Sequence, residues 1–390
     1  MEKGMIEILE DLPRFQNRIH ELKESILANL IIIGELPSPT FQETLRVEFL
    51  VNRYAELGLQ NCSTDEVGNA LGILPGTRGA HNILLVSHVD SDYDESVDHT
   101  VSVQQTSVSG PAIGDNALGA AALATLPLIL DRLGIELQNN LVLMGSTRSL
   151  GRGDIAGSRF FLANSGLPFS HGVCIEGVML GNLSYSSVGL MRCEISYEVP
   201  EEYDWTRFGT SSAIATMNEV INRILEIPVP RRPRTSIRLR SIRGGAGYDT
   251  FATEATLRFE IQSESAEMVA SLSSRINEMI KEVSSNSGGE ISMRIFAQRK
   301  PGGIEFTHPL VEHAREILNV LDVPPRISPS TSDLSAFIDR GIPAIEIGLT
   351  NVEEIGKLNE RIAIEPIYTG LAQLVGLILA IDRGYCDEPE

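Results

Sequence analysis

The 390-residue chain has few cysteines and no long apolar run. Its four cysteines form no C-x-x-C pair, which disfavours a disulfide framework and a cysteine-based zinc site and favours a reducing compartment. The stretches ILANLIII and ATLPLIL are shorter than the roughly 20 residues that a membrane helix needs. Because the N-terminal MEKGMIEILEDLPRF also lacks the basic patch of a signal peptide, we expect a cytoplasmic protein with no membrane partner.

Basic residues are scarce, with 32 Lys and Arg against 52 Asp and Glu and a net charge of −20. A field of that sign repels nucleic-acid backbones and anionic lipid surfaces. Six arginines do lie within residues 231–243. They alternate with apolar residues in TSIRLRSI, a pattern typical of a strand with one solvated face, so we expect no nucleic-acid partner.

Hydrophobic periodicity predicts an α/β protein that contains a second, smaller domain. Residues 14–33 and 41–57 have apolar residues at helical spacing, and short apolar runs such as ILLVS and LVLMG are typical of strands buried on both faces. Within residues 190–300 the strands alternate apolar and polar residues in a βαββαβ order. We therefore predict a catalytic-type α/β domain over residues 1–189 and 301–390, interrupted by a small α+β domain.

Three polar side chains follow or close predicted buried strands. His88 ends the run NILLVS with Asp90 two residues on, Asp115 precedes an Ala-rich helix, and Glu176 lies in the apolar strand VCIEG. Each has a structural interpretation: a strand-end histidine with a carboxylate partner, a helix N-cap, and a paired buried acid. Together they indicate a metal site, in which Asp90 orients the His88 ring.

Seven short motifs occur in order along nearly the whole chain. They are H-V-D at 88–90, G-D-N-x-x-G at 114–119, I-E-G at 175–177, G-G-x-x-x-D at 244–249, S-D-x-x-x-F at 332–337, G-I-P at 341–343 and N-E-x-I at 359–362. In these motifs the sequence resembles the co-catalytic di-zinc exopeptidases and amidohydrolases, which include peptidase T, aminoacylase and the carboxypeptidase G type. The resemblance implies a zinc-exopeptidase-like catalytic domain with an inserted α+β lid through which the chain forms a homodimer.

The sequence departs from that resemblance at the catalytic positions. The resemblance implies a general-base Glu beside a zinc-ligating Glu, but Arg148 and Ser149 stand there, and Gly356 stands where the last His ligand is expected. The lid histidine of the family falls near residues 203–205, which read Tyr-Asp-Trp. Loss of a general base alone costs about 10²–10⁴-fold in rate, so ordinary peptidase chemistry should be nearly abolished.

The remaining candidate site has two interpretations. His88, Asp115 and Glu176 are three ligands that could hold a single zinc ion, with Asp115 left without its second cation. Alternatively Arg148 pairs with Asp115 or Glu176 and replaces the metal, so that no cofactor binds. Asp154 is a weaker candidate for a displaced carboxylate near the lost base.

The resemblance also implies candidate substrate contacts. They are Asp249, Ser332, Asp333 and the strand arginines Arg238 and Arg240, although surface charge balance is an alternative interpretation of the arginines. The sequence thus predicts a peptidase-like homologue that is impaired or inactive, whose enzymatic status stays open. The alternative is a non-enzymatic protein that binds a small peptide or amino-acid-like ligand or forms a dimeric scaffold.

Overall fold

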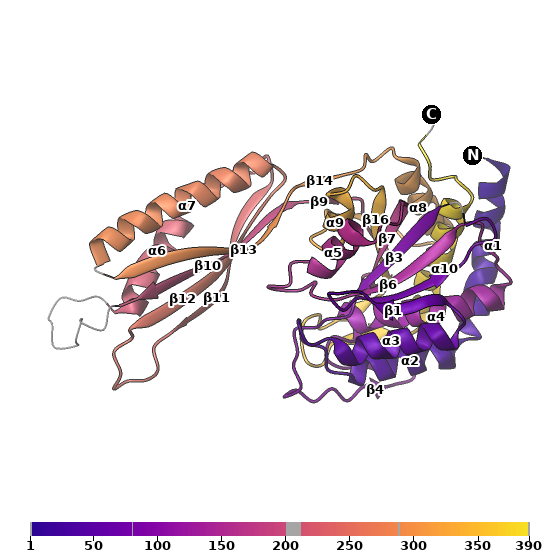
Figure 1. Ribbon diagram of the computed structural model, residues 1–390, viewed down its shortest axis with the longest axis horizontal. Coiled ribbons are helices and arrows are strands. Elements are labelled where there is room, and N and C mark those ends of the chain that lie inside the picture. The colour runs from indigo at the N-terminus through magenta and orange to yellow at the C-terminus, as the bar shows by residue number, and fades with distance from the viewer. Residues whose placement is uncertain (1, 80, 200–211, 288, 389–390) are drawn as a thin grey trace. The chain divides into compact units, whose positions relative to one another are not determined.

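The computed structural model describes residues 2–79, 81–199, 212–287 and 289–388 (Figure 1). The predicted position at residues 203–205 lies outside these ranges. The chain divides into two compact units, which we call the larger unit (Met1–Ser187 with Gly303–Glu390) and the smaller unit (Val188–Gly302).

The larger unit contains a mixed eight-stranded sheet of order β1-β2-β6-β3-β7-β16-β8-β15. Its strands are β1 (Gln60–Thr64), β2 (Ala70–Leu74), β3 (Asn82–His88), β6 (Asn140–Ser146), β7 (Phe169–Val178), β8 (Asn182–Ser184), β15 (Arg326–Ile327) and β16 (Ala344–Thr350). The four central strands β6, β3, β7 and β16 are mutually parallel. Their carboxyl ends therefore meet at one edge of the sheet, which is where open α/β sheets bind ligands.

Helices and short strands complete this unit. The helical segments are α1 (Lys3–His20), α2 (Lys23–Glu35), α3 (Thr44–Glu56), η1 (Ile113–Ala117), α4 (Leu118–Leu133), α5 (Ala156–Asn164), α8 (Pro309–Val320), α9 (Leu334–Ile338) and α10 (Glu365–Asp382). The short strands are β4 (Ser102–Val103), β5 (Ser107–Ser109), β9 (Ser186–Ser187), β14 (Gly302–Gly303), β17 (Val352–Glu353) and β18 (Arg361–Ala363).

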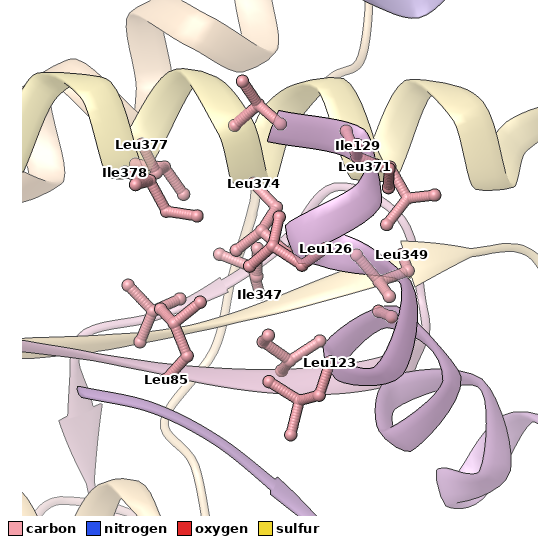
Figure 2. Packing of buried hydrophobic residues seen from close by; sticks show 14 of the residues in the cluster. Leu85, Leu123, Leu126, Ile129, Ile347, Leu349, Leu371, Leu374, Leu377 and Ile378 are labelled. Carbon is pink, nitrogen blue, oxygen red and sulfur yellow. The ribbon is translucent and has the colours of Figure 1, made fainter. Parts of the chain in front are cut away.

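The central strands are buried on both faces, as their unalternating apolar sequences predict. One face packs against α4 and α10, and the other packs against α5 and α9. Figure 2 shows side chains of the first layer from α4, α10, β3 and β16 together with their labels: Leu85, Leu123, Leu126, Ile129, Ile347, Leu349, Leu371, Leu374, Leu377 and Ile378. Each buried side chain of this size stabilises the fold by about 1.5–3 kcal/mol, which fixes the sheet that carries the site.

Two helical segments are long and apolar enough to cross a membrane by composition, namely Ile113–Leu133 and Glu365–Asp382. Of their apolar windows, 89% and 83% of the residues are buried inside the protein. Such burial is typical of the core helices of a soluble α/β protein.

The N-terminal helices differ from the prediction of one helix over 14–33. Helix α1 begins at Lys3 and runs through Pro13, and the chain turns at residues 21–22 before α2 begins. The buried face that includes Met5, Ile8 and Leu12 continues across the proline. Its burial outweighs the single backbone hydrogen bond that proline cannot donate.

The smaller unit has the predicted βαββαβ order. Its elements are β10 (Gly189–Glu198), α6 (Ala213–Leu225), β11 (Thr235–Gly244), β12 (Glu254–Ser263), α7 (Ala266–Ser287) and β13 (Glu290–Arg299). The antiparallel sheet has the order β11-β12-β10-β13, and both helices lie on one face of it (Figure 1). Helix α7 continues through the serine-rich stretch to Ser287.

A pair of buried histidines far along the sheet from the site makes stability depend on pH. His171 Nε2 lies 3.1 Å from the main-chain oxygen of Cys386, and the carboxylates of Asp387 and Glu388 lie 3.8 Å from His171 and His308 respectively. Burial lowers the pKa of both imidazoles below the usual value. The folded state therefore favours the neutral rings, while the unfolded chain binds protons up to its ordinary pKa of about 6.5.

Stability should accordingly be full above about pH 6.5 and fall as the pH drops through the window between the ordinary and the lowered pKa. We expect His171→Gln to flatten part of this dependence in melting curves recorded from pH 7.5 to pH 5. His81→Gln, at an exposed position, serves as the matched control. Parallel pH profiles for wild type and His171→Gln would contradict the assignment.

Candidate metal site

His88 closes β3 at the carboxyl edge of the sheet, and its two ring nitrogens face different partners. Nδ1 lies 3.1 Å from the main-chain oxygen of Asp90 and 3.4 Å from the Asp90 carboxylate. Nε2 lies 3.1 Å from Asp115 Oδ1 and 3.6 Å from Glu176 Oε2. The side chain is 4% exposed, so both contacts are made in a largely dry environment.

The charge around His88 determines its protonation. Burial lowers the pKa of the imidazole, but hydrogen bonds with Asp115, Asp90 and Glu176 outweigh this and raise the pKa well above its usual value. The protein thus favours a positive charge at the Nε2 position, between two carboxylates. A proton supplies that charge in the metal-free protein, and a divalent cation could supply it instead.

Glu176 lies near the end of β7 with a second acid on the neighbouring strand. Burial, together with negative neighbours that include Glu346 and Asp115, raises the pKa of the Glu176 carboxyl to about 8. Glu346 on β16 is itself buried, and its carboxylate accepts hydrogen bonds from the hydroxyls of Ser184, Ser330 and Ser332. The edge of the sheet therefore carries more buried carboxylates than the single positive charge of the His88 imidazole can neutralise.

The turn that carries Asp115 is tied to distant parts of the chain. Glu360 accepts hydrogen bonds from the backbone N–H groups of Gly114 at 2.7 Å and Asp115 at 3.1 Å. Asn116 donates to Ser87 Oγ and to the main-chain oxygen of Ile175. These bonds hold the turn against the ends of β3 and β7, and so place the Asp115 carboxylate over His88.

The donor set suits a single metal ion. Ligand atoms of His88, Asp115 and Glu176 lie within 4.8 Å of one another. Imidazole and carboxylate groups are ordinary zinc ligands, and Asp90 provides the carboxylate partner that usually orients a ligating histidine. Because Asp115 is 43% exposed, one side of the group is open to solvent, as in a site that keeps a position for water.

Within the described ranges, this is the one cluster of three or more His, Cys, Asp or Glu side chains close enough to share a metal ion. Gly356, at the expected position of the last ligand, has a left-handed backbone with φ 72° and donates its N–H to Glu360 Oε2 at 2.9 Å. It brings no side chain to a second metal position.

The loop after β6 occupies the place where the resemblance implies the general base. Asp90 Oδ2 accepts hydrogen bonds from the N–H groups of Ser149 at 2.9 Å and Leu150 at 2.8 Å, and from Thr40 Oγ1 at 2.9 Å. Glu43 Oε1 accepts a further bond from the N–H of Arg148 at 2.8 Å. Two buried carboxylates thus fix the backbone of this loop.

The predicted ion pair of Arg148 with Asp115 or Glu176 is wrong. The guanidinium carbon of Arg148 lies 6.0 Å from the centre of the Phe41 ring, and the side chain lines a cavity on the side of Phe41. The backbone of Arg148 is left-handed, with φ 54°, and its N–H is held by Glu43. Arg148 therefore does not neutralise the metal-type site.

Ser149 and the predicted substrate residues Ser332 and Asp333 have hydrogen-bond partners within the larger unit. The hydroxyls of Ser146 and Ser149 lie 3.3 Å and 3.4 Å from Asp333 Oδ1, and Ser158 Oγ lies 2.5 Å from it. Ser332 hydrogen-bonds to Glu346. Ser332 and Asp333 thus belong to a hydroxyl and carboxylate network, and their substrate-contact role stays a prediction.

Asp154, the candidate for a displaced base, is paired elsewhere. Its carboxylate lies 2.7 Å from Arg159 Nη1 and is largely buried. This ion pair holds the Asp154 carboxylate against Arg159 of α5.

The other predicted substrate residues belong to the smaller unit. Arg238 is exposed on β11, and Arg240 Nη2 lies 2.9 Å from Glu260. That carboxylate also takes a hydrogen bond from Arg192 at 2.9 Å, so the basic strand is balanced by acid within its own sheet. Asp249 is exposed at the mouth of a cavity of about 590 Å³ with Tyr248 and Phe251.

Sequence reasoning missed the acids that hold the site together. Glu346 lies in the apolar run IPAIEIGL, which is the same signal that drew attention to Glu176. Glu360 is part of a quoted motif but carried no role, and Glu43 lies in a polar segment with no signal of its own. The contacts of Glu360 with Gly114 and of Glu43 with Arg148 join positions more than 100 residues apart.

Comparison with solved structures gives the same architecture for several hydrolases. A tripeptidase from Staphylococcus aureus has a TM-score of 0.73 and 17% identity, with 93% of this chain and 99% of that chain covered. The di-peptidase Dug1p from Saccharomyces cerevisiae has a TM-score of 0.77 and 12% identity, with 97% of this chain and 99% of that chain covered. A dinuclear metal-binding peptidase of the M20 family from Bacillus subtilis has a TM-score of 0.63 and 12% identity, with 93% of this chain and 99% of that chain covered.

No protein-family model and no curated protein matches the sequence. The structural likeness extends over both units of the chain, and includes an amidase of the hydantoinase/carbamoylase family from Burkholderia multivorans. The chain therefore has the fold of the M20-type metallopeptidases and amidohydrolases, in which a catalytic-type α/β unit is interrupted by a smaller α+β unit.

Proposed function

We propose that the protein is a single-metal relative of the amide-bond hydrolases and is impaired or inactive as a peptidase. The convergence of His88, Asp115 and Glu176 at the carboxyl edge of the sheet supports a metal position. The loop at residues 148–150 supports the impairment, because Arg148 and Ser149 provide no carboxylate there. The fold supports a hydrolase origin.

The residues of the site would have distinct roles. Asp90 holds the His88 ring so that Nε2 faces the metal position, while Glu360 and Asn116 hold the turn that carries Asp115. A zinc ion bound there would act as a Lewis acid toward water or a carbonyl oxygen. With Ser149 directed at Asp333 and Asp154 paired with Arg159, neither side chain is placed to take a proton from such a water.

A second candidate function is a non-enzymatic protein that binds a small peptide or amino-acid-like ligand, or a dimeric scaffold. The Arg148 guanidinium, which lies over the Phe41 ring and lines a cavity, supports ligand binding. As further proposals, the smaller unit mediates homodimerisation, the protein is cytoplasmic, and nucleic acid and membranes are not partners. The excess of acid over base supports the last of these.

Hydrolysis assays separate the two functions. We expect a panel of dipeptides and N-acyl amino acids, tested with zinc, manganese or cobalt, to show turnover reduced by at least about 10²-fold relative to an enzyme with a general base. Residual turnover that disappears in Glu176→Ala would identify a weak hydrolase. A thermal shift with a ligand but without turnover would identify a binding protein, and brisk cleavage of simple dipeptides would contradict the proposal.

A further inference from the structure

A second cavity lies in the larger unit, on the side of the loop that Arg148 faces. It has a volume of about 480 Å³ and is lined by residues of α3, the loop before it, the turn after β1 and the loop after β6. Cavities of this size hold small organic ligands. The cavity is built from side chains that take no part in the His88, Asp115 and Glu176 group.

One buried carboxylate shapes this cavity. Glu43 Oε1 accepts hydrogen bonds from the N–H of Phe41 at 2.9 Å and the N–H of Arg148 at 2.8 Å. Both of these residues have left-handed backbones, with φ 78° and 54°. Non-glycine residues adopt that conformation at a cost, and such residues concentrate at ligand-binding positions.

The two side chains presented in this way are chemically complementary to a carboxylate beside an apolar group. The Phe41 ring is 55% exposed, and the Arg148 guanidinium lies over it. Arg148 Nε is buried without a hydrogen-bond partner among the residues that the structure describes. A guanidinium can bind a carboxylate through two parallel hydrogen bonds, which would satisfy this nitrogen or its neighbours.

Acidic side chains on the rim indicate the rest of the ligand. Glu48 and Glu66 line the cavity and are exposed, whereas Asp65, also in the lining, accepts hydrogen bonds from the N–H groups of Val67 and Asn69. Rim carboxylates of this kind repel a simple anion and attract an ammonium group. A ligand that carries both charges fits this arrangement better than either ion alone.

We propose that this cavity binds an apolar α-amino acid, with its carboxylate on Arg148, its side chain on Phe41 and its ammonium group toward Glu48 and Glu66. The site is separate from the metal-type group and does not rest on any hydrolytic activity. In this interpretation, the strained backbones of Phe41 and Arg148 serve to aim an aromatic ring and a guanidinium at one ligand.

Isothermal titration calorimetry with L-phenylalanine and L-leucine tests the proposal. Arg148→Gly should weaken binding about ten- to hundredfold, because it removes a charge-assisted pair. Phe41→Gly should also weaken binding. Both variants should melt no lower than wild type without ligand, since glycine adopts a left-handed backbone without strain. Lost affinity would then not reflect unfolding.

Ligand analogues and one further variant complete the experiment. L-Phenylalaninamide lacks the carboxylate and N-acetyl-L-phenylalanine lacks the ammonium group, so both should bind at least about tenfold more weakly than L-phenylalanine. Glu176→Gln, in the metal-type group, should bind L-phenylalanine as wild type does. The proposal is overturned if neither amino acid binds at millimolar concentration, if Arg148→Gly retains full affinity, or if Glu176→Gln abolishes binding.

Discussion

One zinc ion per chain is the expected result when zinc is added to the metal-free protein. His88 Nε2, Asp115 and Glu176 provide a nitrogen and two carboxylate ligands whose atoms lie within 4.8 Å of one another. At a free zinc concentration about 100 times the Kd, binding should stabilise the folded state by about 2.7 kcal/mol. Elemental analysis gives the stoichiometry, and calorimetric unfolding with and without a chelator gives the stabilisation.

The variant His88→Ala should abolish both effects, because it removes the nitrogen ligand and the ring that Asp90 orients. His81→Ala removes an exposed histidine that directly precedes β3 and should leave zinc binding unchanged. Two bound ions per chain would contradict the single-metal proposal. Stoichiometric zinc in His88→Ala would show that the metal binds elsewhere.

Removal of the Asp90 carboxylate should have the largest effect on stability. Asp90 is fully buried and accepts hydrogen bonds from Thr40, Ser149 and Leu150 while it faces His88. Asp90→Ala leaves these three donors without their acceptor and removes one of the carboxylates that face His88. Breaking a buried pair of this kind costs about 3–5 kcal/mol of unfolding free energy, measured by urea denaturation.

The same carboxylate should control zinc affinity. Loss of the partner that orients a ligating histidine typically weakens metal binding about 10–100-fold. Asp90→Asn keeps the shape and one acceptor oxygen, so it should recover part of the stability but little of the affinity. Asp131→Ala, at an exposed position on α4, is the matched control. If Asp90→Ala unfolds in urea as wild type does, Asp90 does not organise the loop at residues 148–150.

The elements that the sequence predicted well are those whose own residues determine them. The run NILLVSH contains enough consecutive apolar residues to indicate a strand buried on both faces, and β3 is buried at every position. The alternation in MRCEISYE likewise predicted a strand of the smaller unit, β10. The break at residues 21–22 and the three-residue β8 were not predictable, because tertiary contacts rather than local pattern decide such short features.

Some residues of the candidate site could likewise be found from the sequence, and others could not. His88 and Glu176 could be found because a polar residue in an apolar strand is unusual. Glu43 and Glu360 lie among polar neighbours, and only folding gives them backbone N–H groups to bind. The predicted ion pair of Arg148 was wrong, since its guanidinium lies over Phe41, a residue 107 positions away that nothing in RSLG signals.

The hydrogen bond from Gly114 to Glu360 joins positions 246 residues apart. During synthesis on the ribosome, the turn at Asp115 emerges long before its acceptor does, and the whole of Val188–Gly302 is translated in the interval. The smaller unit can therefore fold first, while the acids at the sheet edge stay without their final arrangement. A newly made chain cannot complete this turn until Glu360 has left the exit tunnel.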